Sequence, residues 1–215
     1  QDLKKVTLEL GGKSPIIIFG DANLNNALNA TLVGNFYSSG QVCSNGTRVF
    51  VHESICDELI DKLSERTKAI RVGDPFDPKT QLGPLVTREH YEKVLGYVND
   101  AKRSSANHVC GGEVLTGEAL ANGYYITPAI FSDCQDDMAF VRDEVFGPLM
   151  SVLTFHSEDE VVARANSTQF GLAGAVFTQD FNRAHRVANR LQAGSVWIND
   201  YNVTQQSRRA TEKIP

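Results

Sequence analysis

The sequence Pro-Ile-Ile-Ile-Phe at residues 15–19 is an uninterrupted apolar run. A short run of this kind is typical of a strand that is buried on both faces. Apolar residues then recur at helical spacing from Leu24 to Phe36, with Asp21 as the predicted N-cap. The β-branched run at 47–52 follows and predicts a second strand. Strand, helix and strand in this order favour parallel pairing.

The later segments continue this alternation. Strands are predicted at 4–10, around 108–110, and at 124–131, 149–155, 172–178 and 194–199; helices are predicted after Ser54, around 91–98, at 157–165 and at 180–192. Ser54 followed by Asp57 resembles a capping box and predicts the start of the second helix. The predicted fold class is α/β, with a mainly parallel sheet and helices on both faces.

Composition places the chain among ordinary globular proteins. It has 215 residues, of which 41% are hydrophobic and 22% charged, and a net charge of −5. The negative charge argues against nucleic acid or an anionic membrane as the main partner. No apolar run approaches the roughly 20 residues that a membrane span needs.

The four cysteines are Cys43, Cys56, Cys110 and Cys134, without a CxxC pair or a zinc-type histidine spacing. We therefore predict free thiols, no metal and a reducing, cytoplasmic location. The chain begins at Gln1 without a methionine and enters strand-like sequence at once. It resembles the interior of a longer protein, so mitochondrial targeting stays open.

Cys43 lies in a loop, residues 36–48, that is rich in small and turn-forming residues. A thiol on a tight loop between packed elements can be presented to a substrate. Taken alone, however, a structural and inert cysteine is the commoner case. Cys56, on the apolar face of a predicted helix, fits that structural role.

Two features near the start of the chain, Gly-Lys-Ser at 12–14 and Glu9, do not by themselves indicate a site. Gly-Lys-Ser at 12–14 suggests a phosphate-binding loop, but the first glycine of that motif is replaced by Thr7. Glu9, at the polar edge of a predicted strand, is on its own most simply a solvent-exposed carboxylate.

Five segments together resemble one family. Leu-Glu-Leu-Gly-Gly-Lys-Ser-Pro at 8–15 and Gly-Gln-Val-Cys at 40–43 resemble the two active-site signatures of NAD(P)-dependent aldehyde dehydrogenases. Glu-Val-Phe-Gly-Pro at 144–148, Phe-Gly-Leu-Ala-Gly at 170–174 and Gly-Ser-Val-Trp-Ile-Asn at 194–199 resemble later family blocks in the right order. The resemblance covers about residues 3–203. Residues 35–51 are most similar to the betaine aldehyde and 4-trimethylaminobutyraldehyde dehydrogenases.

The resemblance implies a reaction and two catalytic residues. Cys43 is implied as the nucleophile that attacks the aldehyde and forms a thiohemiacetal. Hydride loss to the nicotinamide leaves a thioester, which water hydrolyses to the acid. Glu9, which lies 34 positions before Cys43, is implied as the base that activates this water. The Cys43 backbone N–H is expected to contribute to the oxyanion hole.

The resemblance also implies binding residues. For the cofactor, NAD or NADP, these are Leu10, Gly11, Glu144 and Phe146, with a core aromatic as the less favoured interpretation of Phe146. A trimethylammonio- or amino-aldehyde needs aromatic faces for cation–π contacts. The aromatic candidates are Phe36, Tyr37, Trp197 and Tyr201; Phe36 and Trp197 are equally core candidates, and Tyr201 is preferred because it follows the last strand.

The chain departs from the family at both ends. Residues 1–203 resemble the catalytic domain, and the resemblance implies that the cofactor domain, which precedes it in the family, is not part of these 215 residues. Residues 204–215 diverge and are predicted to be a disordered tail in place of the family's oligomerisation strand. The parent is expected to be a homo-oligomer. Two alternatives stay open: a truncated, non-catalytic product, and a CoA-acylating dehydrogenase, which Glu9 disfavours because an activated water would compete with CoA.

Overall fold

A seven-stranded sheet organises the chain. This computed structural model describes residues 4, 6–117, 120 and 123–203, so the predicted tail at 204–215 lies outside the described residues. The strands are β1 (Pro15–Ile18), β2 (Arg48–His52), β3 (Asn107–Cys110), β4 (Ala129–Ser132), β5 (Leu149–Phe155), β6 (Ala173–Phe177) and β7 (Ser195–Ile198). Their order is β3-β4-β5-β2-β1-β6-β7, and only the β3–β4 pair is antiparallel. The predicted, mainly parallel sheet is confirmed.

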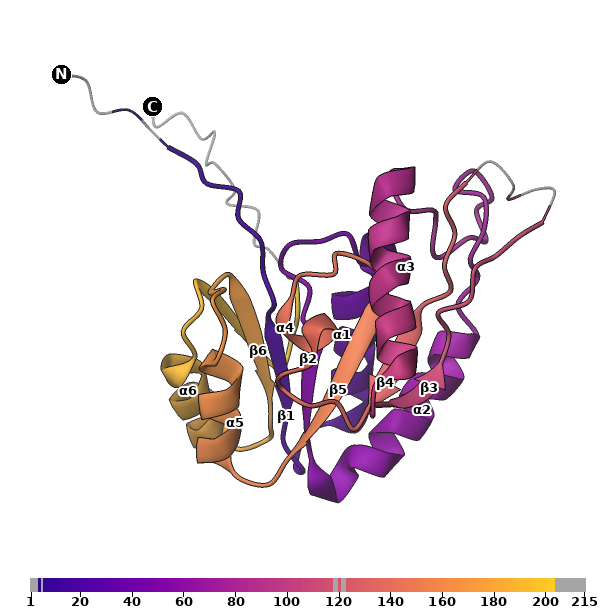
Figure 1. The fold of residues 1–215 in the computed structure, drawn as a ribbon. Coiled ribbons are helices and arrows are strands. Elements are labelled where there is room, and N and C mark those ends of the chain that lie inside the picture. Colours follow the sequence, from indigo (N-terminus) through magenta and orange to yellow (C-terminus); the bar gives the residue numbers. More distant parts are fainter. Residues whose placement is uncertain (1–3, 5, 118–119, 121–122, 204–215) are drawn as a thin grey trace, which may run out of the picture.

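Helices cover both faces of the sheet (Figure 1). They are α1 (Leu24–Phe36), α2 (Cys56–Lys68), α3 (Arg88–Arg103), α4 (Ala139–Arg142), α5 (Glu158–Asn166) and α6 (Phe181–Arg190), with short 3-10 turns η1 (Tyr37–Gly40) and η2 (Glu53–Ile55). Successive side chains of β1 pack on opposite faces of the sheet. Ile17 packs in the core that includes Val94 of α3, and Ile16 packs in the core that includes Leu59 of α2. All four strand residues of β1 are buried, as its apolar run predicts.

The five family-like segments gather at one edge of this sheet. Two segments, 40–43 and 144–148, end before β2 and β5. Two others, 8–15 and 170–174, run into the first residues of β1 and β6, and the segment at 194–199 begins just before β7 and contains it. These five strands are consecutive neighbours and parallel, so they all begin at the same edge. The fold therefore brings together segments that are far apart in the sequence.

The strand predicted at 4–10 is wrong. Val6, Leu8 and Leu10 are 76%, 71% and 62% exposed, and residues 6–10 belong to no strand of the sheet. This segment runs away from the body of the molecule (Figure 1). An alternating pattern becomes a strand only where a neighbouring strand supplies hydrogen-bond partners, and no described segment does so here.

Two helix starts and one strand start also differ from the predictions. Asn23 rather than Asp21 caps α1, because Asn26 N donates to Asn23 Oδ1 at 3.1 Å. The η2 turn precedes α2, whose N-cap is Ile55 without a side-chain bond, so the capping box is wrong. The strand predicted at 124–131 begins only at Ala129, immediately after Pro128, which has no N–H to donate.

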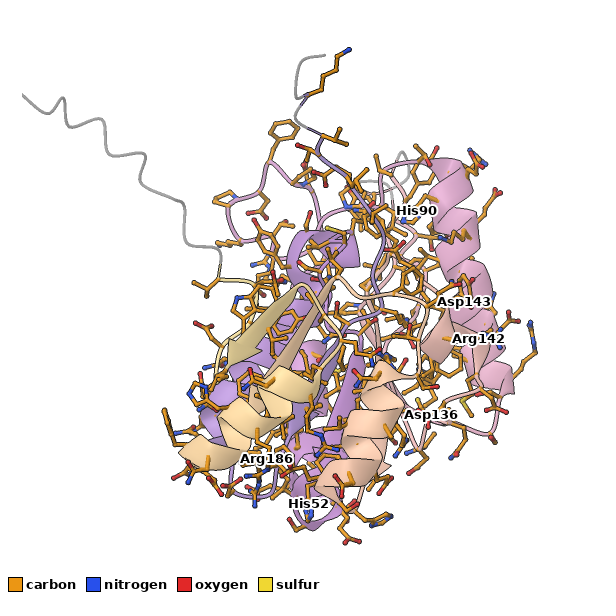
Figure 2. The ribbon with its side chains drawn as sticks, turned by 90° about the vertical axis from the view of Figure 1, so that its left-hand side faces the viewer. His52, His90, Asp136, Arg142, Asp143 and Arg186 are labelled. Atoms are coloured by element: carbon orange, nitrogen blue, oxygen red, sulfur yellow. The ribbon has the colours of Figure 1, made fainter. Side chains whose placement is uncertain are left out.

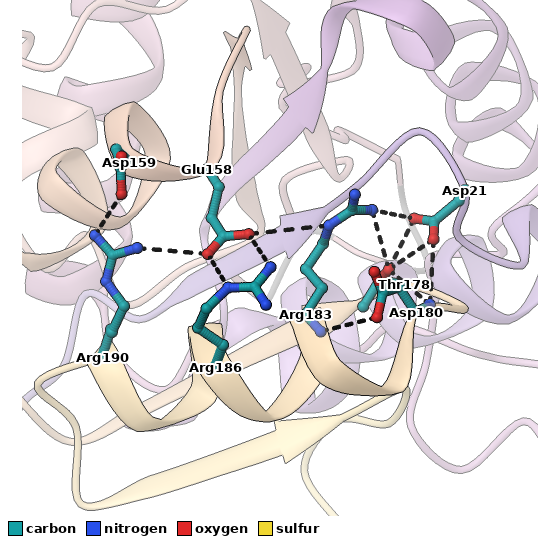
Figure 3. Close-up of polar contacts among 8 residues, drawn as sticks. All are labelled: Asp21, Glu158, Asp159, Thr178, Asp180, Arg183, Arg186 and Arg190. Carbon is teal, nitrogen blue, oxygen red and sulfur yellow. Dashed lines mark hydrogen bonds and ion pairs between the residues drawn. The ribbon is translucent and has the colours of Figure 1, made fainter.

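Asp21 belongs instead to an ion-pair network that joins α5 and α6 (Figure 3). Glu158 accepts hydrogen bonds from Arg186 Nε at 2.7 Å and Nη2 at 2.8 Å. Arg190 also pairs with Glu158, at 3.4 Å. Arg183 reaches Asp21 at 3.1 Å. The network fastens the two helices to each other and to the end of β1.

No helix in the described part of the chain combines the length and apolar character needed to cross a bilayer.

Candidate active site

Cys43 lies in a tight turn just before β2. Asn45 N donates to Val42 O at 3.1 Å, so Cys43 and Ser44 are the two central residues of the turn. Upstream, Ser38, Ser39 and Gly40 all have left-handed φ angles, of 53°, 57° and 74°. Consecutive left-handed residues are rare outside glycine and concentrate at functional sites.

Gly40 meets a second requirement besides its φ angle. A Cβ at this position would collide with the carbonyl of Gly147. The loop that carries Cys43 is therefore in backbone contact with the segment at 144–148, and only glycine permits so close an approach.

Cys43 differs from the other three cysteines in its access to solvent. Cys56, Cys110 and Cys134 are buried, whereas Cys43 is half-buried. Burial raises the pKa of the Cys56 and Cys110 thiols and raises that of Cys134 to about 12. A buried thiol with a raised pKa is a poor nucleophile. The prediction that Cys56 is structural fits its burial.

Gly11 and Gly12 join the candidate nucleophile to Glu144. A Cβ on Gly12 would collide with Cys43 O, so the two backbones touch. Gly12 N also donates to Glu144 Oε1 at 3.0 Å. At Gly11 a Cβ would lie 2.5 Å from Glu144 Oε2. Three of the five family-like segments therefore meet at this glycine pair.

Phe146 has an unusual backbone that neighbouring side chains support. Its φ is 59°. His90, in the first turn of α3 (Figure 2), donates from Nε2 to Phe146 O at 2.6 Å, and the two rings meet edge to face at 5.8 Å. Lys93 Nζ donates to Glu144 O at 3.1 Å. Helix α3 thus positions the segment that carries both predicted cofactor residues, and Phe146 is half-buried rather than part of the core.

Leu10 and Gly11 line an open groove of about 440 Å³, together with residues 169–172. Gly11 has no side chain to cover its backbone, and the half-buried Glu144 carboxylate lies beside it. A groove with an apolar wall and a carboxylate at its border fits a ligand that presents an apolar ring and hydroxyl groups. Of the residues predicted to hold the cofactor, Leu10 and Gly11 line this groove, whereas Glu144 and Phe146 do not, and the cofactor roles of all four stay predictions.

Two buried basic side chains, Lys13 and Arg48, lie close to the site and were not predicted from the sequence. Lys13 is 2% exposed and its Nζ donates to Phe140 O at 2.7 Å. Burial, followed by the nearby Arg48, lowers the pKa of Lys13 to about 7. Arg48 donates to three backbone carbonyls, those of Lys13, Arg164 and Ala165. The one signal of these buried basic groups in the sequence was an arginine, Arg48, at the first position of a predicted buried strand.

The aromatic candidates divide by burial. Phe36 and Tyr201 are 4% and 3% exposed and pack in the core of this chain, so burial does not favour them as substrate contacts, and their substrate role stays a prediction. Trp197 is half-buried and donates from Nε1 to Val203 O at 3.0 Å. Tyr37, by contrast, is 68% exposed at the end of α1. It is the one of these four aromatic residues that is exposed.

Glu9 is exposed on the open segment that leads into Gly11. It does not line the groove of Leu10 and Gly11, and its catalytic role stays a prediction. Among the described residues, no group of three or more His, Cys, Asp or Glu side chains is placed to hold a metal ion.

Comparisons with known proteins agree with this geometry. The model of the aldehyde dehydrogenase family matches residues 1–210. The chain belongs to the aldehyde dehydrogenase family. It is 54% identical over 204 residues to betaine aldehyde dehydrogenase from Brucella anthropi, and 53% identical over 202 residues to that of Mesorhizobium japonicum.

Solved structures of the aldehyde dehydrogenase family share the fold. Betaine aldehyde dehydrogenase from Staphylococcus aureus in complex with NAD+ superposes with a TM-score of 0.88 at 41% identity, covering 91% of this chain and 39% of that one. A putative aldehyde dehydrogenase from Burkholderia cenocepacia has a TM-score of 0.90 at 42% identity, covering 94% and 41%. The two matches to curated relatives include 95% and 94% of this chain. They span only 42% of the length of each relative.

Proposed function

We propose that this chain forms the thiol-bearing part of an NAD-dependent aldehyde dehydrogenase that oxidises an aldehyde to its carboxylic acid. The observation that carries the proposal is the convergence at Gly11 and Gly12. There the turn of Cys43 and the carboxylate of Glu144 meet the segment at 8–15, which also contains Glu9. Membership of the family supports the same activity.

Each proposed step uses a group of this chain. The Cys43 thiolate attacks the aldehyde carbon, and the Cys43 N–H stabilises the oxygen that becomes negative. NAD, when bound, accepts the hydride that leaves this carbon. The product on the protein is a thioester of Cys43. Glu9 then removes a proton from water, which attacks the thioester and releases the acid.

NAD is proposed because solved relatives bind it. The Staphylococcus aureus and Bacillus cereus structures are NAD+ complexes. In this chain Leu10 and Gly11 would border the cofactor, Glu144 would accept hydrogen bonds from ribose hydroxyls, and Phe146 would pack near the nicotinamide. The groove and the contact of Gly11 with Glu144 support these roles.

The proposed substrate is an aldehyde that carries an amino or trimethylammonio group. The betaine aldehyde dehydrogenases that match this chain support this choice. Tyr37 is proposed as the aromatic contact of the cation, because it is exposed and precedes Cys43 by six positions on the same loop.

The remaining proposals concern the whole protein. A cytoplasmic location and assembly of the parent as a homo-oligomer are proposed, and the four free cysteines fit the former. The domain boundary at residue 203 stays a prediction.

A chimera tests the activity. Residues 1–203 of this chain would replace the matching segment of the Brucella anthropi enzyme, and NADH production would be followed with betaine aldehyde and NAD+. We expect turnover, which Cys43→Ala lowers at least about 10³-fold and Glu9→Gln about 10²–10⁴-fold. Cys56→Ala, which removes a buried thiol elsewhere, is the control and should leave turnover intact.

Two results would overturn the proposal. One is a folded chimera that binds NAD+ but does not oxidise any aldehyde offered. The other is a Cys43→Ala chimera that is as active as the parent chimera, which would remove the role of the thiol.

A further inference from the structure

The segment after β7 turns back and reaches the turn of Cys43. Asn199 and Asn202 have left-handed φ angles of 54° and 55°, which asparagine tolerates better than most residues. Asn199 stays fastened to the end of β6, because its side chain bonds the Thr178 N–H and the Thr178 carbonyl, each at 3.0 Å. The chain between these two asparagines is thereby led back over the α1 side of the sheet.

Tyr201 fills a slot that two glycines leave open. At Gly34 of α1 a Cβ would lie 2.7 Å from Tyr201 Cδ1, and at Gly46 it would lie 2.8 Å from Tyr201 Oη. Trp197 packs on the same ring, with the centroids 5.0 Å apart. A larger residue at either glycine would push the tyrosine ring out of place.

The polar atoms of this segment are directed at the residues that follow Cys43. Tyr201 Oη donates to Ser44 O at 2.5 Å, a contact between residues 157 positions apart. Ser44 Oγ donates to Asn202 Oδ1 at 2.7 Å, and Asn202 Nδ2 donates to Asn45 Oδ1 at 3.3 Å. Burial raises the pKa of the Tyr201 hydroxyl above its ordinary value, so it remains a donor at neutral and mildly alkaline pH.

Helix α1 holds a different part of the same loop. Asn35 Nδ2 donates to Gly46 O at 3.1 Å, and Gly46 N donates to Gly34 O at 2.9 Å. These bonds fix the loop where it enters β2. The carbonyl and the hydroxyl of Ser44, the second central residue of the turn, are held by Tyr201 and Asn202 instead.

We propose that Tyr201, assisted by Asn202, is a positioning residue for Cys43. It fixes the Cys43–Ser44 turn through the Ser44 carbonyl, so that the sulfur and the Cys43 N–H keep one geometry relative to the substrate carbon. The proposal rests on the proposed function of Cys43 as the nucleophile. It gives Tyr201 a role that acts through the backbone of the turn rather than through the substrate.

Amide hydrogen exchange and thiol alkylation on the 215-residue chain test the proposal. Tyr201→Phe keeps the ring and removes one hydrogen bond. We expect the Asn45 amide, which closes the turn, to exchange about three- to tenfold faster relative to the amides of β5. Alkylation of Cys43 by iodoacetamide, measured by peptide mass, should accelerate at least about threefold, because the half-buried thiol opens more often.

Two further variants sharpen the test. Asn202→Gly removes the amide at a position whose φ suits glycine, and it should change both rates in the same direction. Tyr125→Phe is the matched control, since Tyr125 is a second buried tyrosine, 6% exposed and outside the site. It should leave the Cys43 alkylation rate unchanged.

The proposal is overturned if Tyr201→Phe leaves either rate unchanged, slows alkylation, or speeds all amides equally, which would show only a global loss of stability. Its failure can be told apart from failure of the proposed function. An active Cys43→Ala chimera removes the nucleophile but not the effect of Tyr201 on the turn, whereas unchanged exchange leaves the chimera result standing.

Discussion

Tyr37 is the residue on which the substrate proposal depends. Tyr37 is 68% exposed, whereas Phe36 beside it is buried. We predict that Tyr37→Ala in the chimera raises the KM for betaine aldehyde by about three- to thirtyfold, because a cation–π contact contributes about 0.5–2 kcal/mol. KM ratios of variant to parent would be compared with those for 3,3-dimethylbutanal, the neutral isostere.

The neutral aldehyde is the control for lost contact area. If Tyr37→Ala raises the KM for both aldehydes by the same factor, the residue contributes packing but no recognition of charge. An unchanged KM for betaine aldehyde would remove Tyr37 from the site.

Lys13 predicts a dependence of stability on pH. Its pKa is lowered from 10.5 to about 7 on folding, mainly by burial. Between these values the unfolded chain holds a proton that the folded chain has released. Stability from this group is therefore complete above pH 10.5 and is lost as the pH falls towards 7.

Lys13→Met should remove that dependence. Urea unfolding between about pH 7 and pH 8.5 should show the parent chain gaining up to about 1.4 kcal/mol per pH unit relative to the variant. Lys68→Met, which removes an exposed lysine of α2, controls for the loss of one positive charge. Parallel pH profiles for the parent and Lys13→Met would contradict the account.

At the scale of elements, α5 and α6 are joined by arginines that converge on one carboxylate (Figure 3). Glu158 is 21% exposed in its side chain, and the hydrogen bonds from Arg186 hold its pKa below the usual 4.5. Its stabilising contribution is therefore present above pH 4.5 and is lost as the pH falls further.

We predict that Glu158→Gln lowers the free energy of unfolding by about 1 kcal/mol at pH 7. The variant should also lose less stability than the parent when the pH falls below about 4.5. Asp159→Asn is the matched control, because Asp159 is 88% exposed and pairs only with Arg190 among the described residues. Equal acid sensitivity of the parent chain and Glu158→Gln would show that the network contributes nothing.

The elements also show what could be predicted from sequence. Strand β5 agrees with the predicted 149–155, because a mainly apolar run that starts directly after Gly147 and Pro148 leaves few alternatives. The strand predicted at 4–10 failed, because alternation shows which residues could share a face but not whether a partner strand exists. Asp21 and Asn23 compete as caps within three residues, and the contacts of Asp21 with Thr178, Asp180 N and Arg183, which are distant in sequence, decide that Asp21 turns away.

The candidate site was predictable for a different reason. The sequence of the loop taken alone favours an inert, structural Cys43. The catalytic roles of Cys43 and Glu9 are implied only by the resemblance to the aldehyde dehydrogenase family. The buried Lys13 and the contact of Tyr201 with Ser44 were missed. Both depend on residues more than 100 positions away, which no local pattern contains.

At the scale of the whole molecule, the site lies at the amino-terminal edge of the sheet. Ligands of open α/β sheets usually bind at the carboxyl ends of the strands. Here the loops before β1, β2 and β5 carry Gly12, Cys43 and Glu144. These loops are far apart in the sequence, but β1, β2 and β5 are neighbouring parallel strands, so the loops before them lie at the same edge. The strand order of the sheet therefore assembles the site.

The central claim is that Cys43 carries the acyl group and Glu9 releases it. The most direct measurement is mass spectrometry of the acid-quenched Glu9→Gln chimera after reaction with betaine aldehyde and NAD+. The account predicts about one equivalent of NADH per site and an acyl group on the peptide that contains Cys43. NADH formation without that adduct, or an adduct on Cys56, Cys110 or Cys134 instead, would contradict it.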